Sequence, residues 1–239
     1  MSILSVLRKI IPEPIRHLIL LIMNLFINKY DSELSFWRKI LEKEKGRFPN
    51  NQYKQFMLAM ADESSDNFLK GKIVADFGCG PQGSLVWARS ALLRIGIDVL
   101  ADRYADEFTD NIISHGMIYL KSTEHVIPLP SNFVDVIFTN NAMDHVVNFS
   151  EMCREIIRVL KPGGEFIGGF NLEEPATPSE PQQLNVGIIN EFLLDKLELR
   201  SYHISKYGGD GHVNLFDENS PYTPGQKGYL LVKAWRKIN

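Results

Sequence analysis

The sequence has little of several features that mark specialised classes of protein. Its 239 residues include only two cysteines, Cys79 and Cys153, and these lie too far apart for the paired ligands of a zinc site. We expect both to be reduced core residues of a cytoplasmic protein, and we expect no metal site. The chain also contains no internal repeat and no low-complexity tract, which argues against a solenoid or a disordered protein.

An excess of positive charge is missing as well. The chain carries 26 Lys and Arg against 29 Asp and Glu, a net charge of −3. A nucleic acid backbone selects for basic surfaces, so the composition gives no case for a nucleic acid partner. Hydrophobic residues make up 44% and charged residues 23%, as in an ordinary globular protein. The length suits one α/β domain with an appendage.

A hydrophobic run long enough to cross a bilayer is not found either. The thirteen residues 15–27 are almost wholly apolar, but a spanning helix needs about 20, and no small-residue cleavage site follows to indicate a secretory signal. We expect residues 1–30 to form an apolar helical segment packed on the domain or on a second subunit of a homodimer. The alternatives are peripheral contact with the inner face of the membrane and a membrane anchor.

What the sequence does contain is a short apolar strand that stops at a cluster of glycines. Residues 73–75 are apolar, Asp76 follows, and Gly78, Gly80 and Gly83 come directly after it. This pattern is typical of a buried parallel strand that turns straight into a helix, which we expect over residues 84–93. Glycine allows a positive φ and lets a ligand approach the backbone closely, so the pattern predicts a nucleoside-binding loop.

Two carboxylates indicate what kind of nucleoside this loop binds. A second strand, residues 93–98, ends at Asp98, eighteen positions after Gly80, where a carboxylate can accept hydrogen bonds from both ribose hydroxyls. Asp76 stands two residues before the first glycine. A pyrophosphate gains nothing from a carboxylate there, whereas a cationic ligand does. We therefore expect a positively charged nucleoside without phosphate.

The remaining pattern alternates between helices and strands. We expect helices over residues 32–45, 51–70, 103–114, 151–160 and 186–195, and further strands over residues 117–120, 133–139, 165–170, 197–206 and 228–238. Residues 171–183 read as a loop, and the connection 207–227 is long enough to be functional or disordered.

Several of these stretches, taken in order, resemble one family. They are Asp76-Phe77-Gly78-Cys79-Gly80, the acid at Asp98, Glu124 before Pro128-Leu129-Pro130, residues 134–138 and Arg158-Val159-Leu160-Lys161-Pro162-Gly163-Gly164. Together they resemble the class I S-adenosylmethionine-dependent methyltransferases over residues 72–170. The resemblance implies a Rossmann-like, seven-stranded, mostly parallel sheet with helices on both faces and an antiparallel last strand. Residues 71–239 would form this domain, residues 31–70 a helical cap, and residues 1–30 an N-terminal helical extension.

The resemblance also assigns roles to individual residues. It implies that S-adenosylmethionine is the cofactor, held by Asp76, Gly78, Cys79, Gly80, Asp98, Val99, Thr123, Glu124, Asn140 and Asn141. The carboxylate of Glu124 would accept a hydrogen bond from the adenine amino group. The residues expected at the acceptor are Tyr30, Trp37, Tyr53 and His212.

The sequence departs from many relatives at Asp144-His145, where an acid precedes the histidine. An imidazole is suited to take a proton from an alcohol acceptor. We therefore consider His145 a general base, with Asp144 orienting it or binding the acceptor. The alternative is that His145 is a packing residue after the fourth strand.

These residues favour an enzyme that methylates a small polar acceptor at a hydroxyl oxygen, for example on a surface-glycan or lipid-linked intermediate. Nitrogen and carbon acceptors remain open. Two other functions compete with it: an NAD-dependent dehydrogenase, and a non-catalytic protein that binds S-adenosylmethionine for regulation.

Overall fold

The computed structural model describes residues 29–206 and 222–238. The expectations for the first thirty residues fall almost entirely on residues 1–28, which lie outside the described residues, and so does the expected acceptor residue His212. Within the described part, no helix is both long and apolar enough to cross a membrane.

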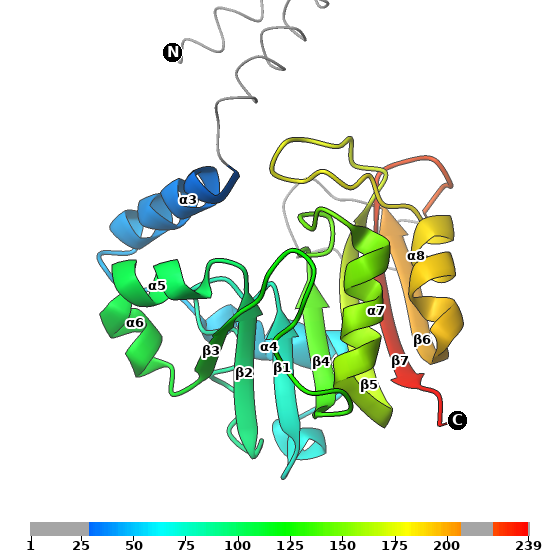
Figure 1. The fold of residues 1–239 in the computed structure, drawn as a ribbon, viewed down its shortest axis with the longest axis horizontal. Helices are drawn as coiled ribbons and strands as arrows, with labels where there is room; N and C mark the ends of the chain where they lie inside the picture. Colours follow the sequence, from blue (N-terminus) through cyan, green and yellow to red (C-terminus); the bar gives the residue numbers. More distant parts are fainter. Residues whose placement is uncertain (1–28, 207–221, 239) are drawn as a thin grey trace, which may run out of the picture.

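Seven strands form one sheet in the order β3-β2-β1-β4-β5-β7-β6 (Figure 1). Their bounds are β1 Ile73–Phe77, β2 Leu93–Asp98, β3 Ile118–Lys121, β4 Val134–Asn140, β5 Leu160–Leu172, β6 Leu197–Lys206 and β7 Gly228–Arg236. The first five strands pair in parallel, and β7 lies antiparallel between β5 and β6. The predicted fold class, with its antiparallel last strand, is confirmed.

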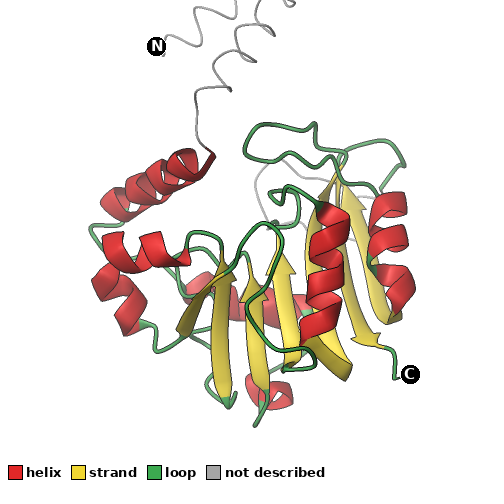
Figure 2. Ribbon diagram, viewed as in Figure 1, coloured by secondary structure: helices red, strands yellow, loops and turns green. Residues whose placement is uncertain are grey.

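Helices cover both faces of this sheet (Figure 2). Their bounds are α3 Lys29–Lys43, α4 Asn51–Met60, α5 Ala101–Glu107, α6 Thr109–Ser114, α7 Phe149–Val159 and α8 Val186–Phe192, with short 3₁₀ turns at Asp66–Leu69 and Leu194–Lys196. In Figure 1, α7 and α8 lie in front of the sheet, α4 lies behind it, and α5 and α6 lie beyond β3. Helix α3 stands above the edge at which β1, β2 and β4 end.

The two faces of the sheet build two separate clusters of buried side chains. Because successive side chains of a strand point to opposite faces, Ala75 and Ile137 join the cluster under α7, whereas Val74 and Val136 join the one under α4. Helix α7 has an apolar stripe at helical spacing, with Asn148 capping its start by accepting a hydrogen bond from the backbone N–H of Glu151 at 3.2 Å. The central strands are therefore buried on both sides, as expected for parallel strands.

The helix that we expected over residues 84–93 does not form, and this prediction was wrong. A continuous helix would join the carbonyl of Val86 to the N–H of Ser90. Instead the Val86 carbonyl accepts from Arg94 at 3.1 Å, and the Ser90 N–H donates to Asp66 at 2.9 Å. The remaining bonds, such as Val86 N–H to the Gly83 carbonyl at 3.1 Å, span three residues as in turns. Hydrogen bonds with the side chains of Asp66 and Arg94 therefore take the place of the backbone hydrogen bonds that a helix would form.

The acidic residue in the fourth strand has a structural role. One carboxylate oxygen of Asp135 accepts the N–H of Ile73 at 2.8 Å, and the other receives the ammonium of Lys161 at 2.6 Å. The pairing of β4 with β5 shifts register at this place. Asp135 therefore fixes the starts of β1 and β5 against β4, at the edge of the sheet opposite to the glycine loop.

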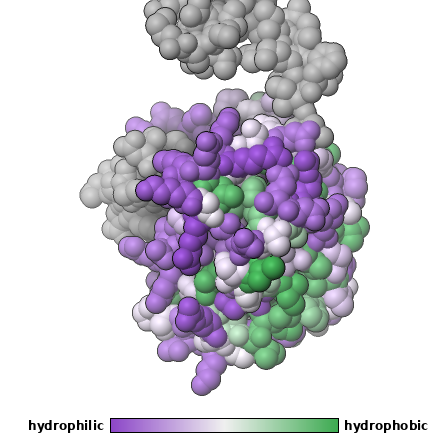
Figure 3. Space-filling model, turned by 90° about the vertical axis from the view of Figure 1, so that its left-hand side faces the viewer, coloured by the Kyte–Doolittle hydropathy of each residue, from purple (hydrophilic) through white to green (hydrophobic). Residues whose placement is uncertain are grey.

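Figure 3 shows the side of the molecule that carries α3 and β3, where hydrophilic side chains cover the upper part and hydrophobic ones gather in the lower right. Two apolar residues on these outer elements are strongly exposed, Ile113 of α6 at 73% and Ile118 of β3 at 49%. Strand β3 is the last strand of the sheet on this side, so within the described residues no further strand covers them.

Candidate functional site

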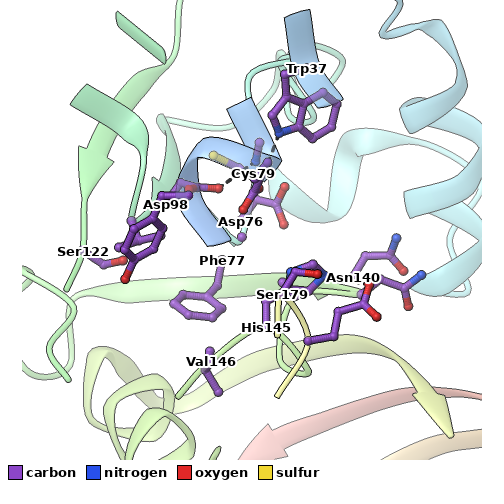
Figure 4. A pocket seen from close by; sticks show the side chains of 18 of the residues that line it. Trp37, Asp76, Phe77, Cys79, Asp98, Ser122, Asn140, His145, Val146 and Ser179 are labelled. Atoms are coloured by element: carbon purple, nitrogen blue, oxygen red, sulfur yellow. Dashed lines mark hydrogen bonds and ion pairs between the residues drawn. The ribbon is translucent and has the colours of Figure 1, made fainter. Parts of the chain in front are cut away.

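The site lies where the strand order reverses between β1 and β4, at the carboxyl ends of the parallel strands, the usual ligand position in open α/β sheets. A cavity of about 610 Å³ opens there. All ten residues that we predicted to hold the cofactor line it, and so do Tyr30, Trp37, Tyr53 and His145. In Figure 4, Trp37 of α3 lies above the glycine loop, and His145 and Ser179 lie together, away from Asp98 and Ser122.

The glycine loop is shaped by close contacts on two sides. Gly78 and Gly80 have φ values of +72° and +54°, a conformation that other residues rarely adopt. A Cβ on Gly78 would lie 2.1 Å from the Cβ of Ala142, and one on Gly80 would lie 2.9 Å from the ring of Trp37. The loop therefore sits tightly between α3 and the segment after β4, with its backbone facing the cavity.

Two carboxylates lie buried beside this loop. Asp98 accepts hydrogen bonds from the backbone N–H groups of Gly80 at 3.0 Å and Leu100 at 2.9 Å, and Asp76 accepts one from the hydroxyl of Ser84. Burial raises the pKa of Asp76 to about 7, and the hydrogen bond from Ser84 opposes the rise. Burial also raises the pKa of Asp98 to about 7, and the charge of Glu33 adds to the rise. Among the described residues, no lysine or arginine forms an ion pair with either.

These groups fit a cationic nucleoside. Two buried carboxylates without a basic partner are stabilised by a positively charged ligand. Asn141, whose φ of +47° turns it toward the cavity that it lines, has a buried side-chain oxygen with no hydrogen-bond partner, and such an oxygen requires a donor. The ammonium of S-adenosylmethionine is such a donor, and its sulfonium adds a second positive charge.

Glu124 lines the cavity but is also bound by α3. Its carboxylate pairs with the ammonium of Lys29, accepts the hydroxyl of Tyr30 at 2.5 Å, and accepts the N–H of Val147 at 3.2 Å. Burial alone would raise the pKa of Glu124, but the hydrogen bonds from Lys29 and Tyr30 outweigh it and lower the pKa. Glu124 therefore joins the start of α3 to the loops after β3 and β4.

At the other end of the cavity, His145 lies between two carboxylates. Its Nε2 is 3.7 Å from Glu180 and 3.9 Å from Asp144. Asp144 is 6% exposed and is not among the residues that line the cavity. Burial raises the pKa of both Asp144 and Glu180. Within the described chain, no group of three or more His, Cys, Asp or Glu side chains is arranged to hold a metal ion.

Sequence reasoning missed several residues that line the cavity, Ser179 and Glu180 among them, and it missed Tyr229, which contacts a lining residue. Ser179 and Glu180 come from the loop after β5, which the backbone N–H of Gln182 ties down by donating to the carbonyl of Asp144 at 3.1 Å. Tyr229 of β7 donates its hydroxyl to the side-chain oxygen of Asn140. A loop rich in Pro, Glu and Ser gives no signal for which residue turns inward, and only the strand order brings β7 close to β4.

The chain resembles known proteins over the part that builds this site. The family model described as "Methyltransferase domain" matches residues 75–168. The ribosomal protein L11 methyltransferase of Listeria monocytogenes is 29% identical over 140 residues, which cover 53% of this chain and 41% of that protein. The ubiquinone/menaquinone biosynthesis C-methyltransferase UbiE of Vibrio parahaemolyticus is 29% identical over 101 residues, covering 41% of this chain and 36% of that protein. The chain thus spans about two fifths of the length of these relatives.

The fold has solved counterparts. The S-adenosylmethionine dependent methyltransferase of Mesorhizobium loti superimposes with a TM-score of 0.55 at 16% sequence identity, covering 74% of this chain and 96% of that one. The glycine loop, Asp98 and the segments after β3 and β4 all fall within the matched residues 75–168. Residues 75–168 thus match a methyltransferase domain in sequence, and the fold is that of the S-adenosylmethionine-dependent methyltransferases.

Proposed function

We propose that this protein transfers a methyl group from S-adenosylmethionine to a hydroxyl oxygen of a small polar acceptor. The observation that carries the proposal is the single cavity that holds both parts of the site. One part is the glycine loop with its two buried carboxylates, and the other is His145 with Glu180. The cofactor supplies a methyl group activated by a sulfonium, and the chain supplies binding, alignment and a proton acceptor.

The cofactor part favours this ligand over a dinucleotide. Residues 84–92 form turns and not a regular helix, so the loop lacks the helix N-terminus on which a pyrophosphate is held. The lysine among the cavity-lining residues, Lys29, is paired with Glu124, and no arginine lines the described cavity. Asp76 and Asp98 would repel phosphates. These features weaken the dehydrogenase alternative.

The acceptor part supports His145 as a general base. Its ring lines the cavity, and its side chain is 39% exposed, so an acceptor hydroxyl can reach it. When the ring takes a proton, the carboxylates of Glu180 and Asp144 stabilise the imidazolium. In this assignment Asp144 acts by orienting and stabilising His145, because it does not line the cavity.

The class of acceptor does not follow from the relatives, whose names refer to a ribosomal protein in one case and to ubiquinone and menaquinone biosynthesis in the other. A surface-glycan or lipid-linked intermediate remains our proposal. We also propose that residues 1–30 contact the inner face of the membrane, and that the protein forms a homodimer.

The test follows label from methyl-labelled S-adenosylmethionine into a panel of small hydroxyl compounds. For an acceptor that is methylated, His145→Asn should lower kcat by roughly 100-fold or more, while the Kd of S-adenosylhomocysteine stays within about twofold of the native value, because no cofactor contact is expected from this ring. Full turnover by this variant would remove His145 from the mechanism.

The same assay separates the enzyme from a regulatory binding protein. A non-catalytic protein would bind S-adenosylhomocysteine and S-adenosylmethionine alike and transfer no label to any compound. The placement of His145 in the cavity, next to the cofactor residues, favours the enzyme.

A further inference from the structure

The charges around the cavity are strongly unbalanced. Five carboxylates line it, those of Glu33, Asp76, Asp98, Glu124 and Glu180, against the one ammonium of Lys29. Lys29 is already paired with Glu124. The other four carboxylates have no lysine or arginine ion pair among the described residues. S-adenosylmethionine has two positive charges and one negative charge. Its net charge of one therefore compensates only one of these four carboxylates.

The imbalance persists at the end that is left for the acceptor. Glu174, close enough to raise the pKa of both Asp144 and Glu180, has its own partner in Lys227 at 3.2 Å. Among the described residues, the ring of His145 is the only basic group that pairs with Glu180 and Asp144, at 3.7 and 3.9 Å. Asp144 also accepts a hydrogen bond from the side chain of Asn171, which carries no charge. One imidazole faces two carboxylates, so at most one of the two negative charges is compensated.

A second observation points to a ligand at the same place. Asp144 is more than nine-tenths buried, and its Oδ1, the atom that faces His145, has no hydrogen-bond partner among the described residues. A buried carboxylate oxygen without a donor is costly unless a positive charge comes close. Glu180, by contrast, is 38% exposed on the cavity side of His145. It can contact a ligand directly, while Asp144 acts on the same ligand through its field.

From this arrangement, and resting on the proposed function, we propose that the methyl acceptor carries a protonated amine, which binds against Glu180 beside His145. The acceptor is then an amine-bearing hydroxyl compound, such as an amino sugar or an amino alcohol. Compounds with a carboxylate or phosphate near the methylated atom are excluded, because the cavity offers them no free cation.

The experiment is calorimetric and uses the full chain saturated with S-adenosylhomocysteine. Glucosamine, N-acetylglucosamine and glucuronate are titrated in turn, since these share a sugar ring and differ in charge. We expect glucosamine to bind at least tenfold more tightly than N-acetylglucosamine, and glucuronate not to bind. Glu180→Gln should weaken glucosamine binding about tenfold and leave the Kd of S-adenosylhomocysteine unchanged. Glu173→Gln, on the same loop but outside the cavity lining, is the matched control and should have no effect.

The outcomes separate this inference from the proposed function. If S-adenosylhomocysteine itself does not bind, the proposed function fails. If it binds, the inference is overturned by equal binding of the amine and its acetylated form, by binding of glucuronate, by the absence of glucosamine binding, or by an unchanged affinity in Glu180→Gln. Where label transfer to glucosamine occurs, the position of the labelled methyl group distinguishes an oxygen from a nitrogen acceptor.

Discussion

At the scale of single residues, Asp76 and Asp98 are the two buried carboxylates that line the cavity. Their pKa values are raised to about 7 by burial, so in the ligand-free protein both carry a proton at acidic pH. The protonated forms stabilise the ligand-free fold below about pH 4, and this contribution is lost as the pH rises through about 7. A cationic ligand prefers the ionised forms, so binding releases protons.

A pH dependence of cofactor affinity follows from these two carboxylates. The Kd of S-adenosylhomocysteine should fall by roughly tenfold for each carboxylate between pH 6 and 7.5, as followed by calorimetry in a series of buffers. Asp98→Asn should flatten the profile, whereas Asp102→Asn, which alters an exposed pair with Lys121, should leave it unchanged. A profile that is flat in the native protein would mean that the bound ligand does not favour the ionised form of either carboxylate.

Tyr229 positions a residue of the cavity, Asn140, through a hydrogen bond. Its hydroxyl donates to the side-chain oxygen of Asn140, a residue that lines the cavity. In Tyr229→Phe the amide is free to rotate, and the affinity for S-adenosylhomocysteine should drop about fivefold, as for one hydrogen bond worth about 1 kcal/mol. Tyr202→Phe, on the exposed side of β6, is the control. Equal affinities of the two variants would show that Asn140 does not need this bond.

The residues predicted to hold the cofactor all line one cavity, and their role as cofactor ligands stays a prediction, as does the role of the expected acceptor residues. Asp76, Gly78 and Asp98 follow strand ends and carry a local signature, and all three line the cavity. Glu180 and Tyr229 come from segments whose approach depends on loop path and strand order, which no local pattern encodes. The roles of His145 and Glu124 remain predictions, although both side chains lie in the cavity.

At the scale of elements, the turn after the glycine loop shows how tertiary contacts override local preference. Residues 84–92 have a sequence that suits a helix, but Asp66 and Arg94 take the backbone groups of Ser90 and Val86 that a helix would join. Asp66→Ala removes a charged acceptor from the Ser90 N–H and should lower the free energy of unfolding by about 1.5–3 kcal/mol, as measured by urea denaturation.

The matched variant for this test is Asp106→Ala, because Asp106 is exposed on α5 and should change the stability by less than about 0.5 kcal/mol. If Asp66→Ala proved as stable as Asp106→Ala, the turn would not depend on this side chain.

Helix α3 is the element that covers the cavity, and Glu124 fastens its first turn through Lys29 and Tyr30. Glu124→Gln keeps the shape but removes the charge that pairs with Lys29. Amide hydrogen exchange in α3 should become several-fold faster in this variant, and should not change in Glu151→Gln, which alters only the exposed pair with His125. Unchanged exchange in Glu124→Gln would show that the rest of the packing holds α3.

At the scale of the whole molecule, the sequence predicted the fold class, the antiparallel last strand and the edge of the sheet that carries the site. The fold class and the antiparallel last strand came from the family resemblance, whereas the edge of the sheet that carries the site followed from apolar strands and from the rule that ligands gather where parallel strands end. The cavity itself was not predictable in this way. It is lined by α3 and by the loop after β5, which lie far apart in the sequence (Figure 1).

The central claim is that this cavity binds a positively charged nucleoside without phosphate. Calorimetric titration of the full chain with S-adenosylhomocysteine and, separately, with NAD tests it most directly. We predict one site for S-adenosylhomocysteine per chain, displaced by S-adenosylmethionine, and no measurable heat with NAD. Tighter binding of NAD, or no binding of S-adenosylhomocysteine, would contradict it.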